Sequence, residues 1–391
     1  MKPLNLLDPQ EAQLRFGNLR RQMEAEKTDA VIITDNADIY YLTGRVFDGY
    51  IYIAPEGIPI YFVRRPVDLE GDGVVTIRKP EEMAQTIGLN TPHRIGLELD
   101  VTAWSVAQRL SKVFEGSDIV NFSPSMRLLR SVKTPAEIEK IRRSGIRQER
   151  VYRRIPHLYH EGMTDLELQV EIERISRLEG CLGQFRISGD SMELYMGNVL
   201  AGDNADTPTP YDFAMGGEGL DPSLPVGCNG TIIRPGDTVM VDVNGNYTGY
   251  MTDMTRTFVA ERTSGIAEKA HQCSMDICRR MQADARPGAE ARSLYATAEA
   301  MAREAGLERY FMGHRQKAGF VGHGVGIEIN ELPVIAPRSR DIIAEGNVIA
   351  FEPKFVIPGA GAVGVENTYC VGATGTECLT NAPEQLITLL A

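Results

Sequence analysis

The sequence predicts a mixed α/β protein of two domains. Its 391 residues suffice for two sizeable cores, and a hydrophobic content of 43% with 24% charged residues is ordinary for a globular chain. Short apolar runs alternate with amphipathic segments up to Val132, whereas the remainder places pairs of longer helices before two strand-rich stretches. We therefore expect one domain over residues 1–132 and a second over 133–391.

The first domain is expected to be an α/β unit that opens with a helix and a strand. Residues 10–26 place apolar side chains among charges at helical spacing, and the strand-like run 30–33 follows. Further strands are expected at 50–53, 58–63, 74–77 and 94–99. Helices are expected at 80–87 and 102–114.

The second domain is expected to begin with two helices, over 135–159 and 165–179, because Thr134 and Thr164 stand where helix caps are needed. A strand-rich middle follows. Two more helices then precede the strand-rich end, at 265–285 and 289–305. The segment 200–230 is rich in Gly, Pro and Asp without periodicity, so we expect a loop that either lines a pocket or is a plain surface insertion.

Four acids and one histidine in the second domain carry the functional signal. Asp242 lies in an apolar run and Asp253 follows eleven positions later, beyond glycines and tyrosines, which predicts a hairpin with one acid on each arm. Glu352 ends another apolar run and Glu366 lies fourteen residues on, which predicts a second hairpin. His323 stands between them among glycines that permit close approach of backbone or ligand.

These residue types suit a pair of divalent ions such as Mn, Co, Fe or Zn. Bridging carboxylates can hold two such ions about 3.5–4 Å apart, and the pair binds and activates a water. Each residue alone has a plainer interpretation, because strand-end Asp is usually a turn former, Glu before Pro is usually at the surface, and a single His is usually structural. Taken together, the five predict a metal-dependent hydrolase.

The phrases around these residues resemble the signature of the pita-bread metallohydrolases, the superfamily of methionine aminopeptidase, aminopeptidase P, prolidase and creatinase. The phrases in question are Asp253-Met-Thr-Arg-Thr-Phe258, Gly322-His-Gly-Val-Gly326, Glu331-Leu-Pro333, Phe351-Glu-Pro353 and Val365-Glu-Asn-Thr368. Upstream, Asn36-Ala-Asp-Ile-Tyr-Tyr-Leu-Thr-Gly44 and Lys133-Thr-Pro-Ala-Glu-Ile-Glu-Lys140 are similar to the prolidase and aminopeptidase P branch.

The resemblance implies a creatinase-like N-terminal α/β domain followed by a pita-bread catalytic domain with pseudo-twofold symmetry. It implies two metal ions between the halves, with manganese the first choice and Co, Zn or Fe as alternatives. The implied ligands are Asp242, Asp253, His323, Glu352 and Glu366. Glu352 is also the carboxylate expected to double as proton acceptor.

The surroundings of this ligand set depart from the resemblance. Asn330 stands where the peptidases carry a second His, Pro225 where they carry an upstream His, and Gly364 where an Arg is common. Asn donates a hydrogen bond but cannot shuttle a proton near neutral pH. His314 or Glu331 are candidates to substitute, although His314 is equally interpreted as an exposed loop residue.

We expect an enzyme that cleaves a C–N bond in a short peptide or other small molecule. Asn330 and His314 join Glu352 as candidate catalytic groups, and Glu331 and Pro225 as candidate substrate contacts. A non-peptide amidohydrolase or lyase on the same metal cage stays open, as does a binding protein that has lost catalysis.

The branch also implies a homodimer in which the N-terminal domain of one subunit reaches the active site of the other. Tyr41 and Arg45 would then touch substrate in trans, and ordinary packing is the alternative for the tyrosine.

Net charge, the lack of long apolar segments and the cysteine pattern predict a cytoplasmic protein that binds neither nucleic acid nor membrane. A formal net charge of −12 argues against nucleic acid. The start has no long apolar segment and no stretch approaches eighteen apolar residues, so neither a signal peptide nor a membrane span is expected. Six cysteines without CxxC spacing are expected to be free thiols, as in a reducing compartment.

Overall fold

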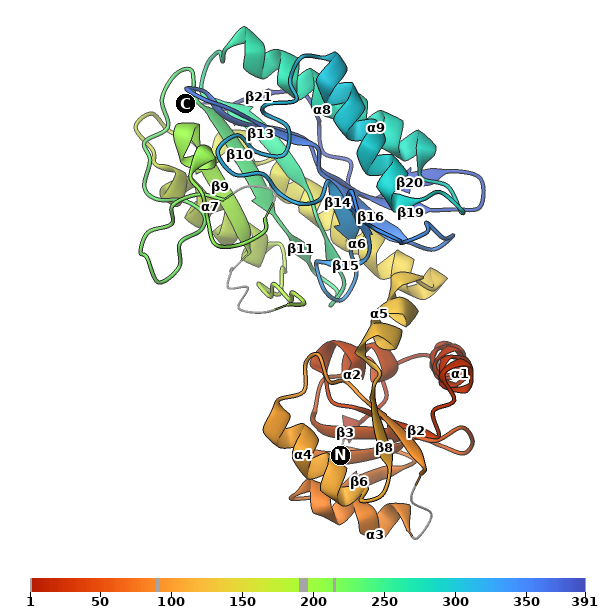
Figure 1. The fold of residues 1–391 in the computed structure, drawn as a ribbon. Helices are drawn as coiled ribbons and strands as arrows, with labels where there is room; N and C mark the ends of the chain where they lie inside the picture. The colour runs from red at the N-terminus through yellow and green to blue at the C-terminus, as the bar shows by residue number, and fades with distance from the viewer. Residues whose placement is uncertain (1, 89–91, 190–195, 214–215, 391) are drawn as a thin grey trace. The chain divides into compact units, whose positions relative to one another are not determined.

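The computed structural model describes residues 2–88, 92–189, 196–213 and 216–390 (Figure 1). The chain forms two compact units, the first ending at Arg130 and the second beginning at Ser131. Both combine helices with sheets, so the predicted mixed α/β class is confirmed. Within the described part of the chain, no helix is both long enough and apolar enough to cross a membrane.

The first unit is built on a six-stranded sheet with the order β6-β4-β3-β2-β7-β8. Its central strands β2, β3 and β4 run antiparallel, whereas β7 and β8 continue parallel to β2. The strands are β2 (Ala30–Ile33), β3 (Asp48–Ile53), β4 (Ile60–Arg65), β6 (Val74–Thr76), β7 (Arg94–Leu97) and β8 (Asp118–Asn121). A short parallel pair adds β1 (Lys2–Pro3) and β5 (Leu69–Glu70).

The helices of this unit are α1 (Pro9–Glu26), α2 (Asn36–Thr43), α3 (Met83–Ile87), α4 (Trp104–Val113) and α5 (Ser123–Ser131). Helix α2 was not among the expected elements. The Asp35 carboxylate accepts hydrogen bonds from the first amides of α2, and Gly44 closes it in the left-handed conformation. Strand β4 starts at Ile60, two residues later than predicted, because Pro59 has no amide hydrogen to pair.

The second unit contains a four-stranded and a five-stranded sheet, each with its own pair of helices. The first sheet has the order β21-β13-β10-β9 and the second β15-β14-β16-β19-β20. The first comprises β9 (Gly197–Ala201), β10 (Thr238–Val243), β13 (Thr255–Val259) and β21 (Ile387–Thr388). The second comprises β14 (Gly322–Gly324), β15 (Glu331–Ile335), β16 (Val348–Phe351), β19 (Asn367–Val371) and β20 (Thr376–Cys378).

The paired helices are α6 (Pro135–Tyr152) with α7 (Asp165–Leu178), and α8 (Gly265–Asp284) with α9 (Ala291–Glu304). Figure 1 shows α8 and α9 side by side over the strands of the C-terminal half. Helix α6 ends at Tyr152 and not at 159 as predicted, since Pro156 has no amide hydrogen to donate to the Tyr152 carbonyl, and a 3₁₀ turn over Ile155–His157 follows. Separate apolar clusters lie under each helix pair.

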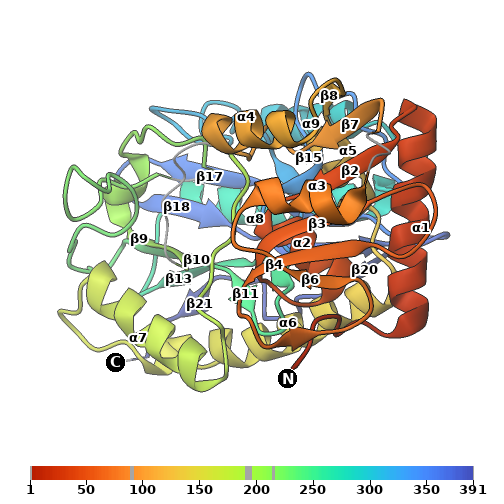
Figure 2. The ribbon, with the colours of Figure 1, turned by 90° about the horizontal axis from the view of Figure 1, so that it is seen from below.

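Two short hairpins complete this unit. One joins β11 (Gly245–Asn246) to β12 (Met251–Thr252), and the other joins β17 (Lys354–Ile357) to β18 (Gly361–Gly364). Figure 2 shows β17 beside β18 and β10 beside β13. Asp242 and Asp253 flank the first hairpin and Glu352 and Glu366 flank the second, so each predicted hairpin is present. The two hairpins bring together acids that are far apart in the sequence, such as Asp242 and Glu366.

Candidate metal centre

The five predicted ligands sit in or directly beside strands of both sheets. Asp242 belongs to β10 and pairs with Thr255 across the ladder, and Asp253 occupies the bend between β12 and β13. His323 belongs to β14, Glu352 follows β16, and Glu366 links β18 to β19. Glycine is required beside the histidine: a Cβ on Gly322 would lie 2.5 Å from the Ala350 carbonyl oxygen of the paired strand.

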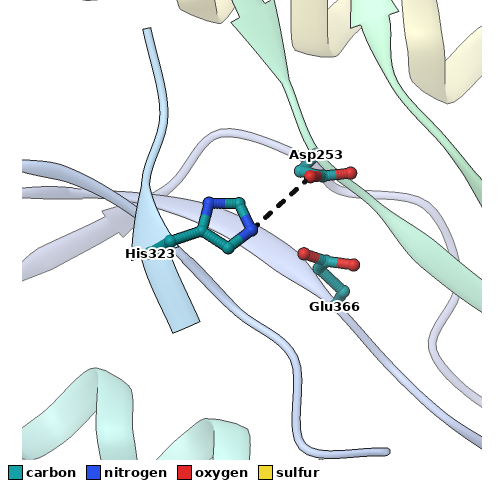
Figure 3. A group of neighbouring side chains, drawn as sticks. All are labelled: Asp253, His323 and Glu366. Carbon is teal, nitrogen blue, oxygen red and sulfur yellow. Dashed lines mark ion pairs between the residues drawn. The ribbon is translucent and has the colours of Figure 1, made fainter. Parts of the chain in front are cut away.

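Asp253, His323 and Glu366 form a compact group in which one ligand atom from each lies within 4.8 Å of the others (Figure 3). His323 Nδ1 is 3.1 Å from the Gly324 carbonyl oxygen, which can only accept, so Nδ1 carries a proton and Nε2 is turned to the acids. Nε2 lies 3.8 Å from Asp253 Oδ2 and 3.3 Å from Glu352 Oε1. A metal-binding histidine is held by a backbone carbonyl in this way.

A lysine lies on the other side of the same acids. Lys354 Nζ is 2.8 Å from Asp242 Oδ2, 2.8 Å from Glu352 Oε2 and 3.0 Å from Glu366 Oε2. The lysine side chain is fully buried, and three hydrogen bonds use all the donors of an ammonium group. Glu352 and Glu366 are therefore shared between this ammonium and the histidine side of the cluster, whereas Asp242 contacts only the ammonium.

Hydroxyls and one guanidinium hold the acidic segments in register. Thr255 Oγ1 donates to Glu366 Oε2 at 2.7 Å, and the Thr368 hydroxyl both accepts from the Asp253 amide and donates to the Asp253 carbonyl. The buried Arg256 donates to the backbone carbonyl of Glu366 at 2.8 Å. The strands that carry the two acids are thus tied to each other independently of any ion.

Burial and mutual repulsion raise the pKa values of two of the acids, whereas neighbouring cations lower that of a third. Burial, with the charge of Asp242, raises the pKa of Asp253 to about 7. Burial and the charge of Asp253 also raise the pKa of Glu366 well above its usual range. Burial acts the same way on Glu352, but the charge of Lys354 and the hydrogen bond from His323 outweigh it and lower the pKa of Glu352 to about 2.

The acids raise the pKa values of the two bases of the centre, His323 and Lys354. Burial disfavours the imidazolium, yet the hydrogen bond and charge of Glu352 raise the pKa of His323 to about 9. Burial likewise opposes the ammonium of Lys354, but the charges of Asp242, Glu352 and Glu366 raise its pKa well above the ordinary value. The centre therefore places four acids, three of them buried, against two bases, His323 and Lys354.

The cluster fits one metal ion on the histidine side. An imidazole nitrogen with carboxylate oxygens is a donor set for Mn, Co, Fe or Zn. Glu366 Oε1 is buried and has no hydrogen-bond partner in the described part of the chain, which is the state of an oxygen placed to receive a cation. Asp253, His323 and Glu366 would hold that ion.

Asn330 and Glu331 are engaged within the fold. The Asn330 amide donates to the Ser188 carbonyl at 2.6 Å and accepts from the Ser188 amide at 2.7 Å, which leaves one amide hydrogen for another partner. Glu331 is buried against Lys133 Nζ at 2.8 Å and accepts from the backbone amide of Ile327 at 3.1 Å. The catalytic role of Asn330 and the substrate role of Glu331 stay predictions.

His314 and Pro225 belong to a loop region around the segment 200–230. His314 Nδ1 is 2.9 Å from Asp206 Oδ2 and its other nitrogen is 3.1 Å from Arg309, so its partners are not members of the acidic cluster. The Pro225 carbonyl accepts from Thr209. Catalysis by His314 and substrate contact by Pro225 are untested predictions.

Tyr41 and Arg45 lie in the first unit. The Tyr41 ring is buried, with the Arg15 guanidinium 4.7 Å from its centroid, so it packs inside its own domain. Arg45 Nε donates to the Pro3 carbonyl at 3.1 Å. Contact of either residue with substrate in trans stays a prediction.

Lys354 is the site residue that the sequence analysis missed. It stands two positions after Glu352, at the first residue of β17. A lysine at the head of the apolar run Lys354-Phe-Val-Ile357 beside a predicted ligand was the available signal. Its cross-strand partner is Gly364, the position where the resemblance has an arginine, so the missing and the added cation are neighbours.

An acidic cluster built from two hairpins of a two-domain α/β chain defines a metallohydrolase-type site, and comparison with known proteins gives the family. The model of metallopeptidase family M24 matches residues 139–373, and that of the creatinase/prolidase N-terminal domain matches residues 15–132. The chain therefore belongs to metallopeptidase family M24 and is an Xaa-Pro peptidase-like hydrolase.

Individual relatives agree with this placement. The chain is 24% identical to an Xaa-Pro dipeptidase of Pyrococcus horikoshii over 371 residues, which are 93% of this chain and 96% of the relative. It is 30% identical over 268 residues to the "Probable dipeptidase PepE" of Mycobacterium tuberculosis, covering 67% of this chain and 62% of the relative. The solved Xaa-Pro dipeptidase from Bacillus anthracis superposes with a TM-score of 0.80 at 22% identity over 97% of this chain and 100% of that one.

Proposed function

We propose that this protein hydrolyses a C–N bond in a short peptide or amino-acid derivative with the help of a bound divalent ion. The observation that carries the proposal is the buried group of Asp253, His323 and Glu366, whose ligand atoms converge within 4.8 Å. The names of the relatives, which are dipeptidases, support a small peptide as the substrate class.

Each residue of the centre has a separate role in the proposed reaction. Asp253, His323 and Glu366 would hold the ion, which when bound polarises a carbonyl and makes a water nucleophilic near neutral pH. Glu352 Oε1, which lies 3.3 Å from His323 Nε2, is the carboxylate oxygen placed to accept a proton from that water. Its other oxygen is held by Lys354, which fixes the orientation of the carboxylate.

Asn330 and His314 are the candidates to meet the developing oxyanion or the leaving amine. Asn330 keeps one amide hydrogen free of Ser188 and can donate it without moving a proton. His314 would have to leave Asp206 to assist. We therefore favour Asn330, which implies a reaction that depends less on general acid help than one with two active-site histidines.

The test is release of free amino acid from a panel of Xaa-Pro and other dipeptides by Mn-loaded protein. We expect metal-dependent release that Asp253→Ala abolishes. Asp276→Ala is the matched control, because Asp276 is half-exposed on α8, where its carboxylate pairs with Arg279 at 2.6 Å and accepts from Gln272 at 3.0 Å. Absence of release from protein shown to hold metal would overturn the peptide assignment and direct the search to non-peptide amides and lyase substrates.

Further attributes complete the proposal. Manganese is the expected ion, with cobalt, zinc and iron as alternatives suited to the same donors. A homodimer is expected from the branch that the N-terminal domain represents. The six cysteines are free thiols in the structure, which supports a reducing compartment such as the cytoplasm.

A further inference from the structure

The position of Lys354 bears on how many ions this centre can hold. Two ions between five ligands need a second set of oxygens besides the Asp253, His323 and Glu366 group, and Asp242, Glu352 and the shared Glu366 are the acids left for it. In the structure, these three acids surround Lys354 Nζ at 2.8, 2.8 and 3.0 Å. The ammonium already has the coordination that a second ion would need.

An ion and the ammonium cannot share these oxygens. Carboxylate oxygens bind Mn or Zn at about 2.0–2.2 Å, whereas the ammonium lies at hydrogen-bond distance from the same three atoms and so occupies the space between them. The charge of a lysine also repels a second cation across a buried, weakly screened gap.

The side chain is also confined to this place. Lys354 is wholly buried in β17, and its carbonyl accepts from the Met312 amide at 2.8 Å. Its ladder partner Gly364 has no side chain, and a Cβ there would lie 3.0 Å from the Lys354 Cα. Any outward swing would leave three carboxylates buried without their cation, which costs several kcal/mol for each unpaired ion.

We propose that the Lys354 ammonium takes the place of one of the two metal ions, so that each chain binds at most one divalent ion, on the side of Asp253 and His323. All three donors of the ammonium are spent on carboxylates, so Lys354 is a positioning residue that offers nothing to substrate. This inference deepens the proposed function and rests on it for the identity of the remaining ion site.

The experiment counts ions on the full-length chain after stripping and reloading with Mn, by elemental analysis and by the electron paramagnetic resonance of the bound Mn. We expect no more than one ion per chain and the spectrum of an isolated Mn(II) in the wild-type protein. Lys354→Gly is expected to bind two ions and to show exchange coupling between them. Lys317→Gly, at an exposed position, is the control and should match the wild type.

Two coupled ions in the wild-type protein would overturn the inference, as would a folded Lys354→Gly variant that still binds only one. If that variant does not fold, the wild-type count and spectrum decide alone. The two proposals fail separately. Dipeptide hydrolysis by a two-ion wild type would refute the replacement and keep the function, whereas one bound ion without hydrolysis of any amide would refute the function and keep the replacement. A wild-type protein that binds no ion would overturn both proposals.

Discussion

Arg256 offers the sharpest test of how the centre is held together. The residue lies three positions after Asp253 and is wholly buried. Its guanidinium donates to five acceptors within 2.9 Å, which are the carbonyls of Thr255, Glu366, Ala382 and Pro383 and the side-chain oxygen of Asn367. It therefore joins β13, β19 and the C-terminal segment in one network that includes the backbone of a ligand.

Replacing Arg256 by lysine keeps the charge and removes the planar fork. An ammonium has three donors, so at least two of the five acceptors lose their partner in a dry environment. Each buried unpaired acceptor costs about 1–3 kcal/mol, which gives a total of about 2–6 kcal/mol. For a domain of this size that corresponds to a fall in melting temperature of at least about 4 °C.

Differential scanning fluorimetry of Arg256→Lys measures this loss. Arg279→Lys is the control, because Arg279 is exposed and its pair with Asp276 on α8 contributes at most about 1 kcal/mol. If Arg256→Lys melts within a degree of Arg279→Lys, the network does not hold the centre and the reasoning is refuted.

Two further predictions concern buried charge. Lys133 and Glu331 form an ion pair whose side chains are 1% and 2% exposed. Lys133→Met and Glu331→Gln should each lower the free energy of unfolding by about 3–5 kcal/mol, and the double variant should lose clearly less than the sum of the two. Urea unfolding measures these losses, and strictly additive values would contradict the prediction. His271 has its pKa lowered by burial, its Nε2 donates to the Glu384 carbonyl at 2.7 Å, and its Nδ1 has no partner in the described part of the chain. The neutral ring is therefore favoured on folding, so its contribution is complete above the unfolded pKa of about 6.5 and is lost as the pH falls, by up to about 1.4 kcal/mol per pH unit. His271→Gln should remove that part of the slope between pH 5.5 and 6.5, and an unchanged slope would refute the assignment.

The helices and most strands of this chain could be predicted from periodicity and capping. Thr134 and Thr164 do cap α6 and α7 through reciprocal bonds with Glu137 and Glu167, as their positions predict. The errors have local causes, such as the prolines that shift the end of α6 and the start of β4. Helix α2 was missed because its eight residues carry little amphipathic signal.

The candidate site shows a different limit. The order of Asp242, Asp253, His323, Glu352 and Glu366 in the sequence pointed to hairpins, and the structure brings these residues together. The ligand pattern could not show which atom fills the space between the acids, because that depends on the direction of a side chain. The structure places Lys354 between Asp242 and Glu366, residues 124 positions apart in the chain.

In the proposed centre, one divalent ion and one lysine ammonium lie among the same acids. The most direct measurement is a crystal structure of the full chain loaded with Mn and recorded near the Mn absorption edge. We predict one anomalous peak, bounded by Asp253, His323 and Glu366, with Lys354 Nζ still among Asp242, Glu352 and Glu366. Two peaks, with Lys354 displaced from these acids, would contradict the account.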